Sequence, residues 1–501
     1  MRLAIEGLER TAMLPDASMV VFGEIGVPMA LHVFMRRGES GASQRPFGHP
    51  LRSSSLLTKS GDCAFLRASH FVLDKQRRGF YARPMDEIDT IENPDTRHKL
   101  FEPLVETIRE RSRSRRKCTG LDDETFLLAG CLRVIEGSAS GREFVQNSSE
   151  GFGIDLEVCA FFQALRSSRR RTMVEECSRE LYRLAETKLA KLDMLETFPE
   201  LQGMAVYAVD GHRISEASHA AKTGEKADTV NTLYQLDIRN GLARPLVVAA
   251  SAQGQVHEIK AFRQSRIQPT AKGLEIVDRA YIDIPWWSDQ ASKGSMMLTR
   301  TKTNMAPVFR RELDWDRSVS INQGVMSDRE AGFNCGHTLR WIEFEDPETG
   351  QSYSFITTCW SLAPGLLCML YLMRWRIEKL YDSFKNKLGQ TKAWATTAHS
   401  RSMQAHFICM AHNLMTILLA QLASDHGIHE HKVHRKQQRF LVKREQVAAK
   451  KGLSIHVFHY MIRGSSQITL QFIRSLRNAL RSTRPFLEKL AFFRRAMNAY
   501  I

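Results

Sequence analysis

The sequence predicts an α/β fold in which helical segments lie before and after a block of strands. Residues 96–200 and 366–422 carry apolar side chains at helical spacing. Between them, short runs of β-branched and aromatic residues are separated by turns such as Asn240-Gly241. This order of elements in a chain of 501 residues predicts about two to four domains arranged around a mixed sheet.

The N-terminal part of this pattern is helical. Leu121-Asp-Asp-Glu124 resembles a helix start, and Glu180–Phe198 carries leucines at amphipathic spacing. Residues 1–84 show little periodicity, and Gly, Ser, Arg and Pro are frequent in them. We interpret residues 1–84 as an extension without a recognisable domain, either disordered or the result of an upstream start codon.

Two groups of strands and two long helices follow. Strands are expected at Met204–Val209, Leu233–Ile238, Leu246–Ala250 and Leu274–Val277, with a helix at Val256–Arg263. A β-rich block at about 292–360 has expected strands at Met296–Thr301, Ser318–Ile321, Leu339–Phe344 and Tyr353–Thr357. The long helices are expected at Leu366–Leu388 and Met403–Leu422.

Charge is the unusual part of the composition. The chain has 71 Lys and Arg against 55 Asp and Glu, a net charge of +16, whereas its apolar and charged fractions are those of an ordinary globular protein. Residues 431–501 contain sixteen Lys and Arg and only two acids, Glu445 and Glu488, so this segment carries +14. A solvated helical face is one explanation, but so large an excess favours contact with the phosphates of a nucleic acid.

Cysteine usage and hydropathy predict a cytoplasmic protein. The nine cysteines are scattered and form no CxxC pair, which argues against a disulfide scaffold and a zinc ribbon and for a reducing compartment. Two apolar stretches, residues 356–373 and 405–423, are interrupted by Pro, Gly, His and Asn, as in buried core helices. We therefore expect no membrane partner.

The segment from Tyr371 to Lys385 carries the strongest chemical signal. On a continuous helix turning by about 100° per residue, Tyr371, Arg374, Glu378 and Lys385 fall within an arc of about 60°. Burying those charges unpaired would be costly, so the stripe is not typical of a core face. It suits a polyanion whose phosphates contact the phenol and the two cations, while Glu378 binds a metal ion.

Two aspartates can complete such a metal site. Asp210 and Asp278 each follow a predicted buried strand, where side chains leave a sheet and converge. Together with Glu378 they can hold two divalent ions about 4 Å apart for phosphodiester displacement. Taken singly, Asp210 before Gly211 is also typical of a turn, and Asp278 can pair locally with Arg279.

These residues carry a resemblance to a known family. The spacing of Tyr371, Arg374, Glu378 and Lys385 is similar to the Y-x2-R-x3-E-x6-K signature of bacterial insertion-sequence transposases of the DDE type, in the group named after insertion sequence four. The resemblance covers residues 120–425. It also includes Tyr207-Ala-Val-Asp210-Gly, Ile276-Val-Asp278-Arg-Ala-Tyr281, Leu298-Thr-Arg300 and Arg374-Trp-Arg-Ile-Glu378.

The resemblance implies an RNase H-like catalytic core at 201–425 with a β insertion at about 292–360. It also implies a helical DNA-binding region at 85–200 and leaves a basic helical region at 426–501. By similarity, Asp210, Asp278 and Glu378 bind two magnesium ions, or manganese, while Tyr371, Arg374 and Lys385 contact DNA. Arg300 follows the second Asp, and Trp286, Trp287 and Trp375 are candidates for stacking on an extruded base. His212 stands where relatives commonly have a small residue.

The reaction implied is hydrolysis at the ends of a DNA element, followed by attack of the freed 3′ hydroxyl on target DNA. The implied partner is double-stranded DNA, bound by a homodimer. Two alternatives remain open: a catalytically inactive DNA-binding protein derived from a transposase, and a structure-selective nuclease with the same core.

Overall fold

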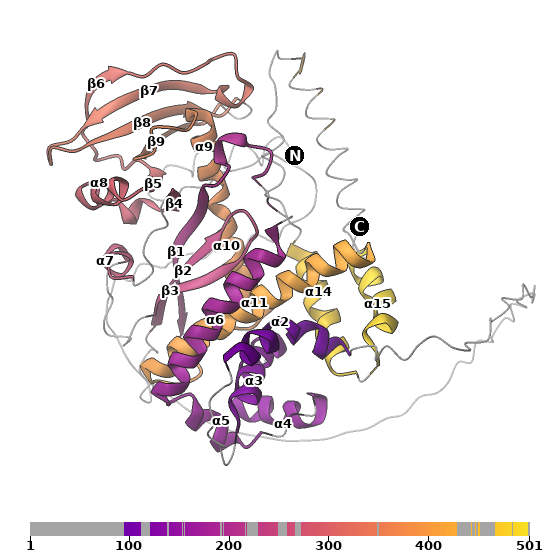
Figure 1. Cartoon of the computed structure of the whole chain (residues 1–501). Helices are drawn as coiled ribbons and strands as arrows, with labels where there is room; N and C mark the ends of the chain where they lie inside the picture. Colours follow the sequence, from indigo (N-terminus) through magenta and orange to yellow (C-terminus); the bar gives the residue numbers. More distant parts are fainter. Residues whose placement is uncertain are drawn as a thin grey trace, which may run out of the picture. The chain divides into compact units, whose positions relative to one another are not determined.

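The computed structural model describes most of the chain from residue 95 onward (Figure 1). The described residues are 95–111, 121–137, 140–152, 156–190, 193, 195–215, 229–248, 258–265, 272–347, 350–427, 466–482 and 484–498, with a few isolated positions between them. The predictions for residues 1–84 and for residues 428–465 of the basic region lie almost wholly outside this set.

Among the described residues, five helices precede the sheet, in a region that the sequence predicts to be helical. They are α2 (Thr96–Arg111), α3 (Asp123–Glu136), α4 (Gly141–Phe152), α5 (Val158–Ala164) and α6 (Ser168–Lys188). The expected helix start is confirmed, because Asp122 caps α3 by accepting a hydrogen bond from the Thr125 amide at 2.8 Å. The expected helix at 180–198 is misplaced: α6 begins earlier, where Ser167 caps it, and ends at Lys188.

A single nine-stranded sheet forms the centre of the described fold (Figure 1). Its order is β3-β2-β1-β4-β5-β9-β8-β7-β6. The strands are β1 (Ala205–Ser215), β2 (Thr229–Asp237), β3 (Ala243–Val248), β4 (Gly273–Val277), β5 (Ser295–Arg300), β6 (Val308–Glu312), β7 (Val325–Gly332), β8 (Thr338–Glu345) and β9 (Ser352–Thr357). Strands β4 and β5 run parallel to β1, and all other pairs are antiparallel.

The β-rich block is a continuation of this sheet, because β9 pairs with β5. Two of its strands, β6 and β7, were not expected from the sequence. All five side chains of the edge strand β6 are exposed, and β7 is largely polar, so neither has a recognisable apolar alternation. The strand expected at Ser318–Ile321 is wrong: a short 3₁₀ helix, η4 (Ser320–Asn322), lies there.

The first long helix expected after the sheet is interrupted twice. It consists of α9 (Pro364–Met373), α10 (Trp375–Asp382) and a π-helical turn, η5 (Ser383–Lys387). Around Arg374 the backbone tightens, with hydrogen bonds from Arg374 N to Tyr371 O and from Ile377 N to Arg374 O, both 3.0 Å. The π turn unwinds the end of the helix. The predicted arc of about 60° is therefore wrong, since it assumes an uninterrupted helix of 100° per residue.

Each face of the sheet packs on its own apolar cluster. On one face α6, α9 and the long helix α11 (Ala398–His426) enclose residues such as Ile276, Phe355 and Phe407. On the other face, α7 (Glu258–Arg263) and α8 (Ile284–Ser292) cover Val209, Val277 and Trp341. By length and composition α11 is apolar enough to cross a membrane, but 61% of its most apolar window is buried inside the structure.

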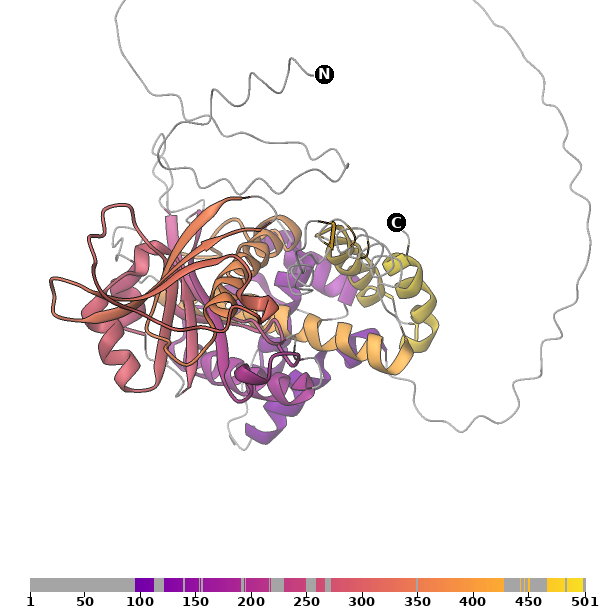
Figure 2. The same cartoon turned by 90° about the horizontal axis from the view of Figure 1, so that it is seen from above.

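The C-terminal helices pack on the N-terminal ones. α14 (Ser466–Leu480) and α15 (Phe486–Asn498) contact each other, α2 and, for α14, α3. α11 extends from β3 to this bundle, where the ring of its last residue, His426, lies 5.8 Å from that of Phe486 (Figures 1 and 2). The described part of the basic region is thus a packed structural element.

Candidate active site

The two aspartates singled out in the sequence lie next to each other in the sheet. Val209 of β1 and Val277 of the parallel strand β4 are paired, and Asp210 and Asp278 follow them directly. Asp278 then caps the short 3₁₀ helix η3 (Arg279–Tyr281). The expectation that Asp210 ends its strand is wrong, because β1 continues to Ser215 as the partner of β2. Only its parallel neighbour ends there.

Gly211 does not mark a turn of the chain. It lies inside β1, and a Cβ atom at this position would approach Oε1 of Glu258 to 2.6 Å. Glu258 belongs to α7 and also makes an ion pair of 4.0 Å with Arg213. Sequence reasoning missed Glu258, although it lies in a helix that was expected.

Arg374 joins two of the three predicted catalytic carboxylates. Its Nη1 lies 3.2 Å from Oδ2 of Asp210, and its Nη2 lies 3.3 Å from Oε1 of Glu378. The side chain of Arg374 is 12% exposed and that of Asp210 18%, whereas that of Glu378 is 40% exposed. A nearly buried cation is thus held between one buried and one half-open carboxylate.

The charges at this point influence one another strongly. The pKa of Asp210 is raised to about 7. Burial is the main cause and the charge of Glu378 adds to it, while Arg374 and the Gly211 amide act in the opposite direction. Burial alone would lower the pKa of Arg374. Tyr371 and the charges of Asp210, Asp278 and Glu378 outweigh this effect and raise it. All three carboxylates therefore act on the same guanidinium.

The aromatic residues around the site come from α9 and α10. Tyr371 is buried, with the Arg374 guanidinium 5.9 Å from its ring centre. Tyr381, which sequence reasoning missed, donates a hydrogen bond of 2.6 Å from its hydroxyl to the Asp210 carbonyl and stacks on His212 with 4.6 Å between ring centres. Tyr381 thereby fixes β1 against α10.

The remaining predicted DNA contacts lie in different environments. Lys385 is exposed on η5, and after burial its charge is the second cause that lowers the pKa of His212, to about 4. Arg300 lies over the ring of Tyr353, 4.8 Å from its centre. The structure thus brings Tyr371 and Arg374 together with the acids and leaves Lys385 open to solvent.

The candidate base-stacking tryptophans differ in exposure. Trp287 is fully buried and donates from its indole nitrogen to the Tyr281 carbonyl at 3.0 Å, so the expectation that it stacks on a base is wrong for this conformation. Trp286 is half-buried and meets Phe262 edge-on, with ring centres 5.3 Å apart. Trp375 is 56% exposed on α10, directly after Arg374.

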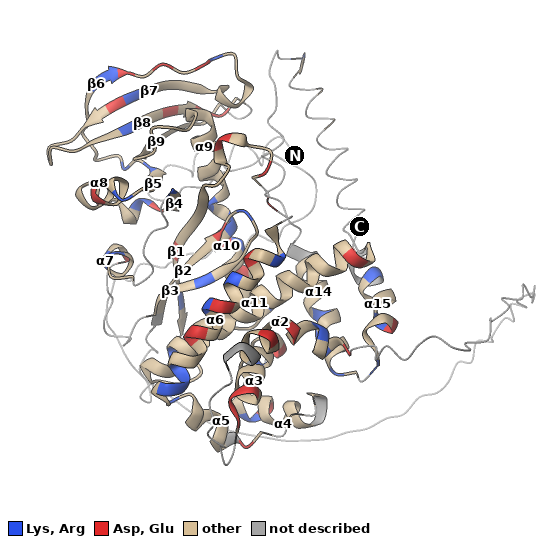
Figure 3. Cartoon of the chain, in the orientation of Figure 1, with Lys and Arg blue, Asp and Glu red and all other residues tan. Residues whose placement is uncertain are grey.

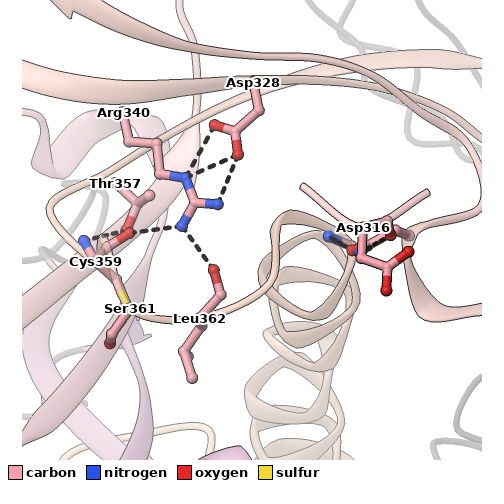
Figure 4. Close-up of polar contacts among 9 residues, drawn as sticks. Asp316, Asp328, Arg340, Thr357, Cys359, Ser361 and Leu362 are labelled. Carbon is pink, nitrogen blue, oxygen red and sulfur yellow. Dashed lines mark hydrogen bonds and ion pairs between the residues drawn. The ribbon is translucent and has the colours of Figure 1, made fainter. Parts of the chain in front are cut away.

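A buried ion pair fixes the start of the helix that carries Tyr371. Arg340 of β8 donates to both carboxylate oxygens of Asp328 on β7, at distances from 2.6 to 3.2 Å (Figure 4). Its Nη1 also donates to the carbonyls of Cys359, at 3.2 Å, and Leu362, at 2.7 Å. These carbonyls lie in the turn between β9 and α9, so the insertion strands hold the entrance to α9.

A second contact fastens the same helix end. The amide of Gly365 donates to Oδ1 of Asn322 at 3.0 Å, and the side-chain amide of Asn322 donates to the Asp316 carbonyl at 2.8 Å. Figure 4 shows Asp316 beside the N-terminal end of this helix. A Cβ atom at Gly365 would lie 1.9 Å from the Ile321 carbonyl oxygen, so only glycine allows the approach.

Several basic side chains of the helical regions are engaged within the protein. Arg169 and Arg170 of α6 both bind Asp123, at 2.7 to 3.2 Å. Arg477 of α14 donates to the carbonyls of Ile135 and Lys387. Figure 3 shows Asp and Glu interspersed with Lys and Arg along α6 and along the strands of the insertion.

One comparison with known proteins relates part of this chain to a family. Residues 201–414 match the family model of the transposase DDE domain. A search of curated proteins returned no match. The match covers less than half of the chain, and within residues 201–414 it indicates an RNase H-like core of the class found in DDE transposases. This class acts on DNA and generally uses divalent metal ions.

The three carboxylates of the site suit such an ion by their chemistry but not by their present arrangement. Three carboxylates are the ligands that magnesium and manganese prefer, and all three act on one cation here. Among the described residues, however, no three His, Cys, Asp or Glu side chains are gathered closely enough to hold a metal. Between Asp210 and Glu378 the position is taken by the Arg374 guanidinium. The chemistry of the donors fits a divalent cation, and Arg374 fills part of the place that it would need.

Proposed function

We propose that the protein is a transposase of the insertion sequence four group, which cuts the ends of a DNA element and joins the freed 3′ ends to target DNA. The observation that carries the proposal is that Asp210 and Asp278 follow paired residues of neighbouring strands, with Arg374 held between Asp210 and Glu378. The transposase DDE domain match over residues 201–414 supports the same reading.

The proposed roles follow from position and charge. Asp210, Asp278 and Glu378 would hold two divalent ions, Mg²⁺ or Mn²⁺, which lower the pKa of the attacking hydroxyl and stabilise the leaving oxygen. The Arg374 guanidinium and the Tyr371 hydroxyl lie beside the acids and orient a phosphodiester by hydrogen bonding to its oxygens. Lys385, exposed on η5, offers a further cation to the DNA backbone.

Other features belong to the proposal as well. Trp286 and Trp375 remain candidates for stacking on a base outside the helix, and Arg300 for a phosphate contact near Tyr371. A homodimer is proposed because two element ends must be held together for joining. The helices at 95–190 are the proposed DNA-binding region.

The alternatives are separated by the products formed. The test incubates the purified protein and Mg²⁺ with a duplex that carries the terminal inverted repeat of its element, a duplex with the repeat scrambled, and a target plasmid. The proposal expects cleavage at the repeat and joining of its 3′ end to the plasmid. Equal cutting of the scrambled duplex without joining would identify a nuclease, and tight binding without cutting an inactive relative.

Matched variants assign any activity to the site. Asp278→Asn removes a proposed ligand without changing side-chain size, and should retain DNA binding but lose both cleavage and joining. Asp289→Asn is the control, because Asp289 is an exposed aspartate on α8 that pairs with Lys293 at 2.6 Å. Its products should equal those of the unchanged protein. Cleavage by Asp278→Asn at the same rate would overturn the assignment of the site.

A further inference from the structure

Arg374 has two proposed partners that it cannot serve at once. It lies 3.2 Å from Asp210 and 3.3 Å from Glu378, with only 12% of its side chain exposed. In that position its two terminal nitrogens bind carboxylates, and little of the guanidinium is available to a phosphate. The same position separates two of the carboxylates proposed to hold a divalent ion.

One movement resolves both conflicts. If the guanidinium swings away to a DNA phosphate, it loses its two carboxylate partners and gains the phosphate. Asp210 and Glu378 then lose the cation between them, which favours the uptake of a divalent ion in its place. A phosphate supplied by DNA is thus the ligand that makes this exchange favourable.

We propose that Arg374 is an internal substitute for the metal ion, and that DNA binding opens the metal site by drawing Arg374 from Asp210 and Glu378. The inference rests on the proposed function, since it concerns the same acids. It makes DNA and the divalent ion coupled ligands, so each raises the affinity for the other by the same factor. The free protein therefore binds the divalent ion weakly. The ion binds tightly only after the DNA is in place.

The surroundings of Arg374 allow this movement. The residue occupies the tightened turn between α9 and α10, and Glu378 at its outer side is 40% exposed. Its ion pairs are single contacts longer than 3 Å, whereas Arg340 makes paired contacts as short as 2.6 Å. The neighbouring helix is held independently, because Arg376 donates to the Ile238 carbonyl. Arg374 can thus move without releasing α10.

The test measures Mn²⁺ binding to the full chain by electron paramagnetic resonance, first without DNA. The Arg374→Gln variant should bind Mn²⁺ about tenfold or more tightly than the unchanged protein, the effect expected when one cation in contact with two carboxylates is removed. Arg374→Lys keeps the charge and should bind weakly. Arg213→Gln controls for the loss of a nearby exposed cation, since Arg213 is 57% exposed and pairs with Glu258 instead.

In a second arm of the experiment, a short DNA duplex without the terminal repeat is added. It offers phosphates but not the element end at which cleavage is proposed. Mn²⁺ affinity of the unchanged protein should rise by about tenfold or more, and that of Arg374→Gln should change much less. Equal affinities of Arg374→Gln and the unchanged protein without DNA would overturn the inference. So would Arg374→Lys binding Mn²⁺ as tightly as Arg374→Gln.

Failure of the inference can be distinguished from failure of the proposed function. If Mn²⁺ binds and Glu378→Gln abolishes this binding, the metal site stands, and only the response to Arg374→Gln decides the inference. Glu378→Gln is also combined with each of the other variants. If it changes Mn²⁺ binding in none of them, with or without DNA, the acids do not form a metal site, and both proposals fail.

Discussion

Arg340 in the insertion and Arg374 at the candidate active site hold carboxylates in different ways. Arg340 and Asp328 are 5% and 0% exposed, and Arg340 also donates to two carbonyls. Arg374 makes single contacts of 3.2 and 3.3 Å, and one of its partners, Glu378, is 40% exposed.

The difference separates a structural ion pair from an exchangeable one. Charges that are fully removed from water must have every hydrogen-bonding group satisfied, and Arg340 meets this condition. A site that has to exchange ligands must remain partly hydrated and incompletely bonded, as Arg374 is. The first pair holds the entrance to α9, and the second lies at the end of the same helix.

The largest expected effect on stability comes from breaking the buried ion pair of Arg340 and Asp328. Asp328→Ala leaves the Arg340 charge buried without its partner and should lower the free energy of unfolding by about 3–5 kcal/mol. Urea unfolding followed by circular dichroism measures this loss. The double variant Asp328→Leu, Arg340→Met removes both charges at similar volume and should recover most of it. A loss below 1 kcal/mol for Asp328→Ala would contradict the structural role.

A smaller effect is expected where a third arginine joins the C-terminal helices to the core. Arg477 is half-buried, and its Nη2 donates to the Lys387 carbonyl at 3.0 Å. Arg477→Met keeps the aliphatic stem but removes the donors, and should cost about 2 kcal/mol in the free energy of unfolding. The exposed Arg484, a few residues further on, gives the control variant Arg484→Met, which should lie within about 0.5 kcal/mol of the unchanged protein. Equal stabilities of the two variants would refute the contact.

A pH-dependent effect on stability concerns a buried carboxylate whose direct partner is neutral. Glu275 of β4 accepts hydrogen bonds of 2.9 Å from the Gln235 side chain, and burial raises its pKa from 4.5 to about 7. The folded protein keeps this proton over a pH range in which the unfolded chain has released it, so stability falls as pH rises from about 4.5 to about 7.

The Glu275→Gln variant tests this dependence. It cannot ionise, so its free energy of unfolding should decrease less between pH 5 and pH 8 than that of the unchanged protein. Asp237, whose pKa burial raises to about 6, contributes to both proteins and cancels in the comparison. Identical decreases would show that Glu275 titrates normally in the folded protein.

The sequence singles out the residues around Arg374 but not those around Arg340, and it assigns Arg374 to DNA phosphates and not to Asp210 and Glu378. Asp210, Asp278 and Glu378 were identified from strand ends and spacing, because acids beside apolar strands are unusual. Asp328 lies in a strand that was not expected and Arg340 in one that was, but their pairing depends on a register between β7 and β8 that spacing does not reveal. The resemblance implies an RNase H-like core, whereas β6 and β7 were missed because their side chains are largely polar or exposed.

Local backbone detail explains the remaining differences. The stripe from Tyr371 to Lys385 was drawn on a regular helix, and no residue in it signals the tightened turn at Arg374 or the π turn at 383–387. Asp210 before Gly211 was interpreted as a possible turn, whereas both residues lie inside β1 and Glu258 approaches Gly211 there.

The central claim, that these three carboxylates cut DNA, is tested most directly by one measurement. The rate of Mg²⁺-dependent nicking at the terminal repeat is compared between the unchanged protein and Glu378→Gln at equal DNA occupancy. The account predicts a fall of about a thousandfold or more for Glu378→Gln, with DNA affinity unchanged within about twofold. Nicking by Glu378→Gln at the rate of the unchanged protein would contradict it.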